Sequence, residues 1–172
     1  AKFRTQPYTF IKDGPQVFLP NLMISFHEVA EKSDMEAYVA RLGEVARALD
    51  PSVERAKAAA SDGNRPPRFS FDQAIQESRN VIAGAPFGAG KDSPLLADAK
   101  AKIKALQDGG KVSADEAKAL NEAAVKALKE QVGPAYTRVI AWLESDRPNS
   151  SAEMKGAGTL KDGVNYYNTQ LE

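Results

Sequence analysis

The sequence predicts an all-α fold, an irregular array of about five to six helices in one domain spanning residues 1–172. From Ser33 onward, apolar residues recur at the three- and four-residue spacing that places them on one face of a helix. Residue types that begin helices precede these stretches. The length of 172 residues suits one folding unit, and no Pro-, Ser- or Gly-rich linker is long enough to separate two domains.

The first 32 residues are expected to form an irregular or extended N-terminal segment. Three prolines and Gly14 interrupt its apolar residues, and such residues are typical of turns and loops. Residues 22–26 could form either a short strand or one helical turn. They are apolar enough to need a partner surface.

The first regular helix is expected to begin at Ser33, which forms a capping box with Glu36. Its apolar face runs to Leu49. Asp50 and Pro51 then predict a restart, because Asp caps helices and Pro is favoured at their first position. This second piece runs to about residue 60, and the Arg65-Pro66-Pro67-Arg68 connector that follows is stiff and extended.

Two shorter helices come next. Ser70 with Gln73 is expected to cap the first, and residues 84–90 form a loop. Ser93 and Pro94 open the second, which Gly109 and Gly110 stop.

The longest element is expected over residues 113–144, beginning with the capping box of Ser113 and Glu116. Its roughly 30 residues would span ~45 Å. Pro134 lies inside it and predicts a kink near residues 131–133. A Gly-rich loop then leads to a short helix expected over residues 162–171.

Composition excludes several classes of function. The 23 basic and 23 acidic residues balance, which gives no electrostatic reason to expect nucleic acid or an anionic membrane as a partner. No apolar run approaches the ~20 residues of a membrane span. The absence of cysteine removes disulfides and thiolate chemistry, and a single histidine cannot supply the two imidazoles of most catalytic zinc sites.

Two segments resemble functional motifs but lack residues that those motifs require. The segment from His27 to Glu31 begins like the zinc motif His-Glu-x-x-His, but its fifth residue is glutamate. The segment 84–92 resembles a phosphate loop only faintly, because Ala85 and Asp92 occupy positions that need glycine and a hydroxyl residue. We therefore expect no catalytic residue and no metal ligand in this chain.

Arg68 and the pair Tyr166-Tyr167 are the candidate substrate-binding residues. Arg68 lies on the rigid connector between two helices, and the tyrosines follow a glycine turn near the end of the chain. Packing and surface charge are the simpler explanation. The functional alternative is the wall of a cleft for a carboxylate or peptide, since arginine binds carboxylates with two parallel hydrogen bonds.

Five segments resemble the bacterial "domain of unknown function 885" family. Their order and spacing along the chain match the family, and they are Ser33-Asp-Met-Glu-Ala-Tyr-Val-Ala-Arg-Leu42, Gly63-Asn-Arg-Pro-Pro-Arg68, Ser93-Pro-Leu95, Ala141-Trp-Leu-Glu144 and 156–167 with its Tyr166-Tyr167. The family's members resemble large, mostly helical zinc metallopeptidases whose His-Glu-x-x-His lies well downstream of the Tyr-Tyr segment.

The resemblance implies that this chain is a fragment of a larger hydrolase and its non-catalytic helical portion. It would supply scaffold and a cleft wall, and its partners would be the remainder of the parent chain and a peptide substrate. By itself it is expected to be inactive and to hold no cofactor. Zinc is expected only in the missing part. The alternative is an autonomous helical protein-interaction module. The first residue is Ala1 rather than Met, which is compatible with an exported precursor, and we favour a periplasmic or exported location over a cytoplasmic one.

Overall fold

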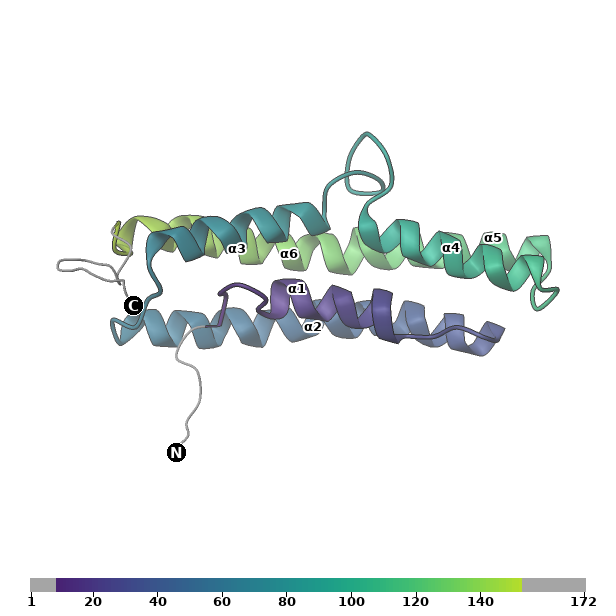
Figure 1. The fold of residues 1–172 in the computed structure, drawn as a ribbon, viewed down its shortest axis with the longest axis horizontal. Helices are drawn as coiled ribbons and strands as arrows, with labels where there is room; N and C mark the ends of the chain where they lie inside the picture. Colours follow the sequence, from purple (N-terminus) through teal and green to yellow (C-terminus); the bar gives the residue numbers. More distant parts are fainter. Residues whose placement is uncertain (1–8, 153–172) are drawn as a thin grey trace, which may run out of the picture.

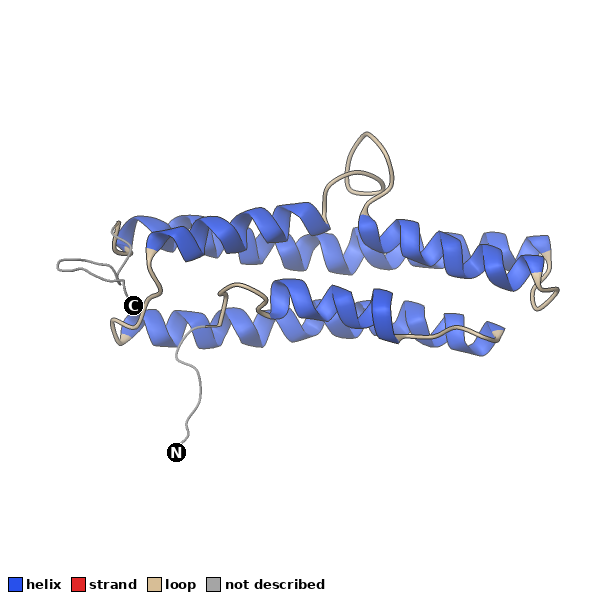
Figure 2. Cartoon of the chain, in the orientation of Figure 1, coloured by secondary structure: helices blue, strands red, loops and turns tan. Residues whose placement is uncertain are grey.

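The computed structural model describes residues 9–152, and these are helical with no β-strand among them (Figure 2). The all-α prediction is therefore confirmed. The elements in chain order are α1 (Pro15–Asn21), the π-helical turn η1 (Leu22–Phe26), α2 (Lys32–Ser61), α3 (Arg68–Val81), α4 (Pro94–Asp108), α5 (Ala114–Ala127), the π-helical turn η2 (Leu128–Val132), α6 (Gly133–Asp146) and the 3₁₀ turn η3 (Arg147–Asn149).

The helices form an elongated bundle (Figure 1). One layer holds α2, with α1 and η1 lying along it. The other holds α3 and α4 end to end beside the continuous run of α5, η2 and α6, and a loop projects where α3 and α4 meet. The core lies where α2 packs on α5 and α6, and where these pack on α4 and α3.

The N-terminal segment differs from the prediction over Pro15–Asn21, which forms the helix α1 rather than an irregular or extended chain. Residues 22–26 adopt the helical turn, one of the two predicted alternatives. Pro15 occupies the first turn of α1, where a missing N–H costs nothing. Pro20 lies inside α1 and cannot donate to the carbonyl of Gln16 four residues earlier. The Tyr136 hydroxyl of α6 donates to that carbonyl instead, at 2.9 Å. A side chain distant in the sequence thus replaces the hydrogen-bond donor that Pro20 lacks.

The predicted restart at Asp50-Pro51 is also wrong, since α2 continues through Pro51. A proline inside a helix costs about 3 kcal/mol. Buried residues on both sides of it, among them Leu49 and Val53, continue the same apolar face of α2. Burying one such side chain contributes about 1.5–3 kcal/mol, so packing along the whole face outweighs the cost of the proline.

Two predicted caps are displaced by neighbouring residues. Glu31 caps α2 in place of Ser33, because the Asp34 carboxylate accepts from the backbone N–H groups of Ala30 and Glu31 at 2.9 and 3.0 Å. These bonds hold the pKa of Asp34 below its ordinary value. Helix α3 begins at Arg68 with Pro67 as its cap, and Ser70 is buried within its first turn.

The long, kinked helix is confirmed. The backbone N–H of Glu116 donates to the Ser113 hydroxyl at 3.0 Å, and the Glu116 carboxylate accepts from the N–H of Ser113 at 2.8 Å. The kink is the π turn η2, in which the N–H of Gly133 donates to the carbonyl of Leu128, five residues earlier. The regular pattern of backbone hydrogen bonds is thus interrupted directly before Pro134, as expected where a proline lies inside a helix.

Candidate functional site

Ion pairs of arginine with carboxylates hold together the end of the bundle where α3 begins and α6 ends. Arg65 donates two hydrogen bonds to Asp146, at 2.8 and 3.0 Å, and Asp146 is buried. These bonds from Arg65 hold the pKa of Asp146 below its usual value, although burial opposes the shift. Arg147 pairs with Asp72 in the same two-bond manner. These side chains therefore tie α6 and η3 to α3 and its connector.

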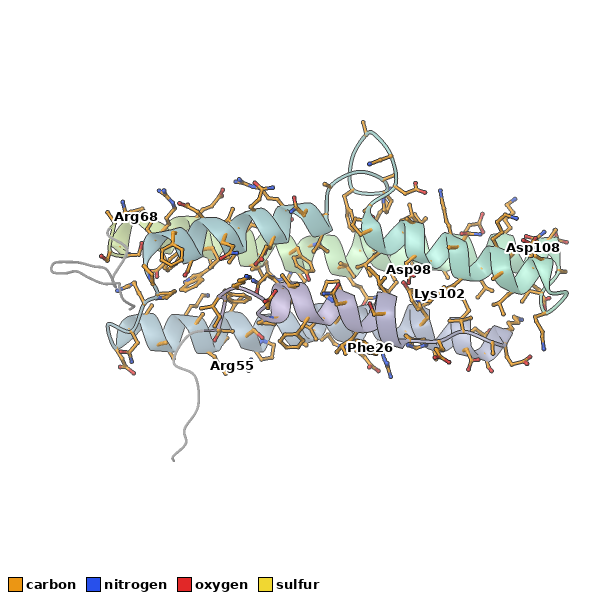
Figure 3. All side chains as sticks on the ribbon, viewed as in Figure 1. Phe26, Arg55, Arg68, Asp98, Lys102 and Asp108 are labelled. Atoms are coloured by element: carbon orange, nitrogen blue, oxygen red, sulfur yellow. The ribbon has the colours of Figure 1, made fainter. Side chains whose placement is uncertain are left out.

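Arg68, the predicted substrate contact, binds its own chain. Its guanidinium donates to the carbonyls of Pro148 and Ser150 at 3.2 and 2.9 Å and to the Ser150 hydroxyl at 3.3 Å. Its backbone N–H donates to the carbonyl of Ser151 at 2.8 Å. Figure 3 shows Arg68 at this end of the bundle. Tyr166 and Tyr167 lie outside the described residues, so a substrate-binding role for the three residues stays a prediction.

A small cavity lies beside the Arg65–Asp146 pair. Its volume is about 20 Å³, and its walls include Phe10, Phe71 and Trp142. A space of this size holds about one water molecule and is too small for a peptide side chain. The arginine-rich end is therefore packed within the part of the chain that the structure describes.

A second polar cluster lies at the other half of the bundle, between α2, α4 and η1. The Tyr38 hydroxyl of α2 donates to the Asp98 carboxylate of α4 at 2.7 Å. Lys102, one turn further along α4, donates to the same carboxylate oxygen at 2.7 Å. The side chains of Asp98 and Lys102 are only 15 % and 18 % exposed. Figure 3 shows the two residues close together on the side of α4 that faces α1 and α2.

Lys102 also satisfies the backbone of the π turn η1. Its ammonium donates to the carbonyls of Met23 and Ile24 at 3.0 and 3.2 Å. With Asp98, this makes three acceptors for the three N–H donors of a lysine. The ammonium also lies 5.0 Å from the centre of the Tyr38 ring, within reach of a cation–π interaction. Every donor of Lys102 is therefore used by the fold.

The cluster is arranged for stability rather than for proton transfer. Burial, and secondarily the hydrogen bond to Asp98, raise the pKa of the Tyr38 hydroxyl far above its ordinary value. The hydroxyl therefore stays protonated as a donor across the physiological range, and it is poorly placed to act as an acid or base. Sequence reasoning missed this cluster. The available signal was the Asp98–Lys102 pair at a spacing of four, which is flanked by buried residues such as Ala99 and Ile103.

His27, the single histidine, packs against this cluster. Its ring meets Tyr38 edge-on with centroids 5.3 Å apart, and its Nε2 lies 3.2 Å from the carbonyl oxygen of Asp34. Across residues 9–152, no three His, Asp or Glu side chains are grouped so that they could hold a metal ion. The described residues therefore do not fit a zinc site.

Apolar side chains also lie exposed on the surface. Phe18, Leu22 and Phe26 of α1 and η1 are 47 %, 45 % and 75 % exposed, and Phe69 at the start of α3 is 47 % exposed. The sequence predicted that residues 22–26 need a partner surface, and it left open whether they form a short strand or one helical turn. None of the helices within residues 9–152 is long and apolar enough to cross a bilayer.

The fold is similar to part of one solved crystal structure, of a protein described as a "putative lipoprotein" from Colwellia psychrerythraea. The TM-score is 0.73 at 19 % sequence identity, and the match covers 84 % of this chain but 23 % of that chain. No curated protein matches the sequence. The sequence profile of a family described as "Bacterial protein of unknown function (DUF885)" matches residues 7–172, nearly the whole chain, and we conclude that the chain belongs to this family.

Proposed function

We propose that this chain is the helical, non-catalytic portion of a larger bacterial hydrolase of the zinc-metallopeptidase type, to which it contributes scaffold. One observation carries the proposal: the buried polar groups of both clusters are engaged by the fold itself. Arg65 and Lys102 bind side chains and carbonyls of their own chain. The size of the solved neighbour, of which the match covers 23 %, supports a role within a longer protein.

The reading frame beyond Glu172 tests this proposal. We expect it to continue and to encode a His-Glu-x-x-His motif. The complete product should hydrolyse a peptide library and lose that activity with a zinc chelator, whereas residues 1–172 alone should be inactive with added zinc. A stop codon after Glu172, or zinc-dependent hydrolysis by the 172-residue chain, would refute the proposal.

Within this proposal, Arg68, Tyr166 and Tyr167 form part of the wall of a peptide cleft. The conservative variants Arg68→Lys and Tyr166→Phe/Tyr167→Phe test it in the complete product. A cleft role predicts a KM raised several-fold with little change in kcat. Arg147→Lys is the matched control, because Arg147 also pairs across the same bundle end. Equal effects of Arg68→Lys and Arg147→Lys on KM would contradict the cleft role.

An autonomous helical interaction module is the second candidate, favoured by the exposed apolar side chains of α1 and η1. It predicts a reading frame that ends near Glu172 and a stable chain with a separate protein partner. As to compartment, we propose export. The solved neighbour is described as a "putative lipoprotein", and fractionation of the source bacterium would test the location.

A further inference from the structure

We infer that one face of α1 and η1 is a docking surface for the remainder of the same full-length polypeptide. This face consists of Phe18, Leu22 and Phe26 and is called here the aromatic stripe. The inference rests on the proposed function, which makes the bundle a portion of a longer protein, and it assigns the surface through which that portion is held.

The helical segment that carries the stripe has no charged residue. Residues 15–26 contain no Asp, Glu, Lys or Arg, although these make up 27 % of the whole chain. On the inner face, Gln16, Pro20 and Met23 are buried against the bundle. The outer face exposes Phe18, Leu22 and Phe26 together with the uncharged polar residues Asn21 and Ser25. A surface helix normally carries charged residues on the face opposite the core, and this outer face has none.

The π turn keeps the three stripe residues in line. They are spaced four apart, and four residues exceed one turn of an α-helix, which takes 3.6. The π turn closes hydrogen bonds over five residues and is wider, so four residues fall short of its full turn. Over four residues the chain therefore rotates slightly more than one full turn about the helix axis in α1 and slightly less in η1, and these two deviations oppose each other. Lys102 holds the Met23 and Ile24 carbonyls of this turn, so the stripe is preorganised.

A groove runs beside the stripe, between α1 and α2. Phe18 and Leu19 line one side, and Ala48, Pro51 and Arg55 line the other. Figure 3 shows Phe26 and Arg55 on the α1–α2 side of the molecule, away from α3 and α4. An apolar segment with a carboxylate near Arg55 would complement this surface.

The area of the stripe argues against a second copy as its occupant. From their exposed fractions, three side chains of this size offer roughly 300 Å², whereas a stable interface buries about 800 Å² on each partner. A segment of the same polypeptide is already tethered, and its high effective concentration makes a small patch sufficient. More than three quarters of the solved neighbour's chain lies outside the match, which is ample length to supply such a segment.

Hydroxyl-radical footprinting of the 172-residue chain and of the complete reading-frame product tests the inference. The modification rates of Phe18 and Phe26 should fall at least fivefold in the complete product. Phe69 is the matched control, because it is as exposed as Phe18 but lies on α3, and its rate should change less than twofold. Unchanged rates at Phe18 and Phe26 in the complete product would overturn this inference and leave the proposed function standing. A reading frame that ends at Glu172 would overturn both.

Serine substitutions provide a second measurement. The triple variant Phe18→Ser/Leu22→Ser/Phe26→Ser should lower the Tm of the complete product by several degrees more than it lowers that of the 172-residue chain, in which Phe18 and Leu22 are already half-buried. Phe69→Ser should lower the two Tm values equally. Equal Tm values for the complete product and its triple variant would contradict docking. So would protection of Phe18 and Phe26 that appears only with added phospholipid vesicles, or only as protein concentration rises, because the occupant would then be a membrane or a second copy.

Discussion

Replacing Lys102 with methionine should destabilise the chain strongly, because three acceptors depend on its ammonium. Methionine preserves most of the length of the stem and removes the charge. Asp98 then retains only the Tyr38 hydroxyl among the partners described here, and the Met23 and Ile24 carbonyls lose their donor. Breaking a buried pair by removing one partner costs about 3–5 kcal/mol. Since the pair is 15–18 % exposed, we expect about 3 kcal/mol.

Urea and thermal unfolding, followed by circular dichroism, measure this effect. A loss of about 3 kcal/mol in a domain of this size corresponds to a Tm lowered by about 6–12 °C. Lys104→Met is the matched control, because Lys104 pairs with Asp108 on the same helix at the same spacing of four. Those side chains are 75 % and 65 % exposed, and exposed pairs contribute at most about 1 kcal/mol.

A double-mutant cycle separates the ion pair from the carbonyl contacts. Asp98→Asn alone leaves Lys102 with the two carbonyls, and the double variant removes both charges. We expect a coupling energy of about 1–2 kcal/mol between the two sites. The reasoning is refuted if Lys102→Met costs no more than Lys104→Met, because the η1 carbonyls would then not depend on the ammonium.

Three further predictions concern pH, a hydrogen bond and a turn. Arg65 lowers the pKa of Asp146 in the folded state. The ion pair therefore stabilises the fold at pH values above the pKa of an unfolded aspartate, ~4, and this contribution is lost as the pH falls through the lower pKa of the folded state. Asp146→Asn should therefore lose less unfolding free energy on acidification than the unsubstituted chain, and an equal loss in urea titrations would contradict this. Tyr136→Phe should cost about 1–2 kcal/mol in urea unfolding, because it removes the donor to a buried carbonyl. Gly84→Ala should cost more than 1 kcal/mol, because φ is +88° and an added Cβ would lie 2.1 Å from a backbone oxygen; Gly88→Ala, which meets nothing within 4 Å, should leave the Tm unchanged.

Local signals explain why much of the fold was predictable. The capping box of Ser113 and Glu116 closes over three residues, and Gly109 and Gly110 end α4 at the expected place. Pro134 lacks a backbone donor, and the π turn directly before it lies where the kink was predicted. Each of these features depends on atoms within about one helical turn.

The candidate site was much less predictable. Arg68 was predicted on the extended connector before a helix, whereas it is the first residue of α3. Its partners Pro148 and Ser150 lie about 80 residues away. The Tyr38–Asp98–Lys102 cluster joins α4 to α2 and η1, whose contacting residues lie 60 and 79 positions earlier in the chain. A periodic pattern marks Tyr38 as buried, but it does not reveal which carboxylate its hydroxyl meets.

The sequence by itself determined that the chain is mostly helical and where α2, α3, α4 and the continuous run of α5, η2 and α6 lie. Hydrophobic periodicity and helix caps depend on residues close together in the chain, and composition on the sequence alone, so all three can be recognised without a structure. Only the tertiary structure decided whether Pro20 and Pro51 end their helices. Neither proline does, because a hydroxyl 116 residues beyond Pro20 replaces the lost donor and continuous burial along α2 outweighs the cost at Pro51. The contacts of one helix with its neighbours, and not its own sequence, set the balance at these two positions.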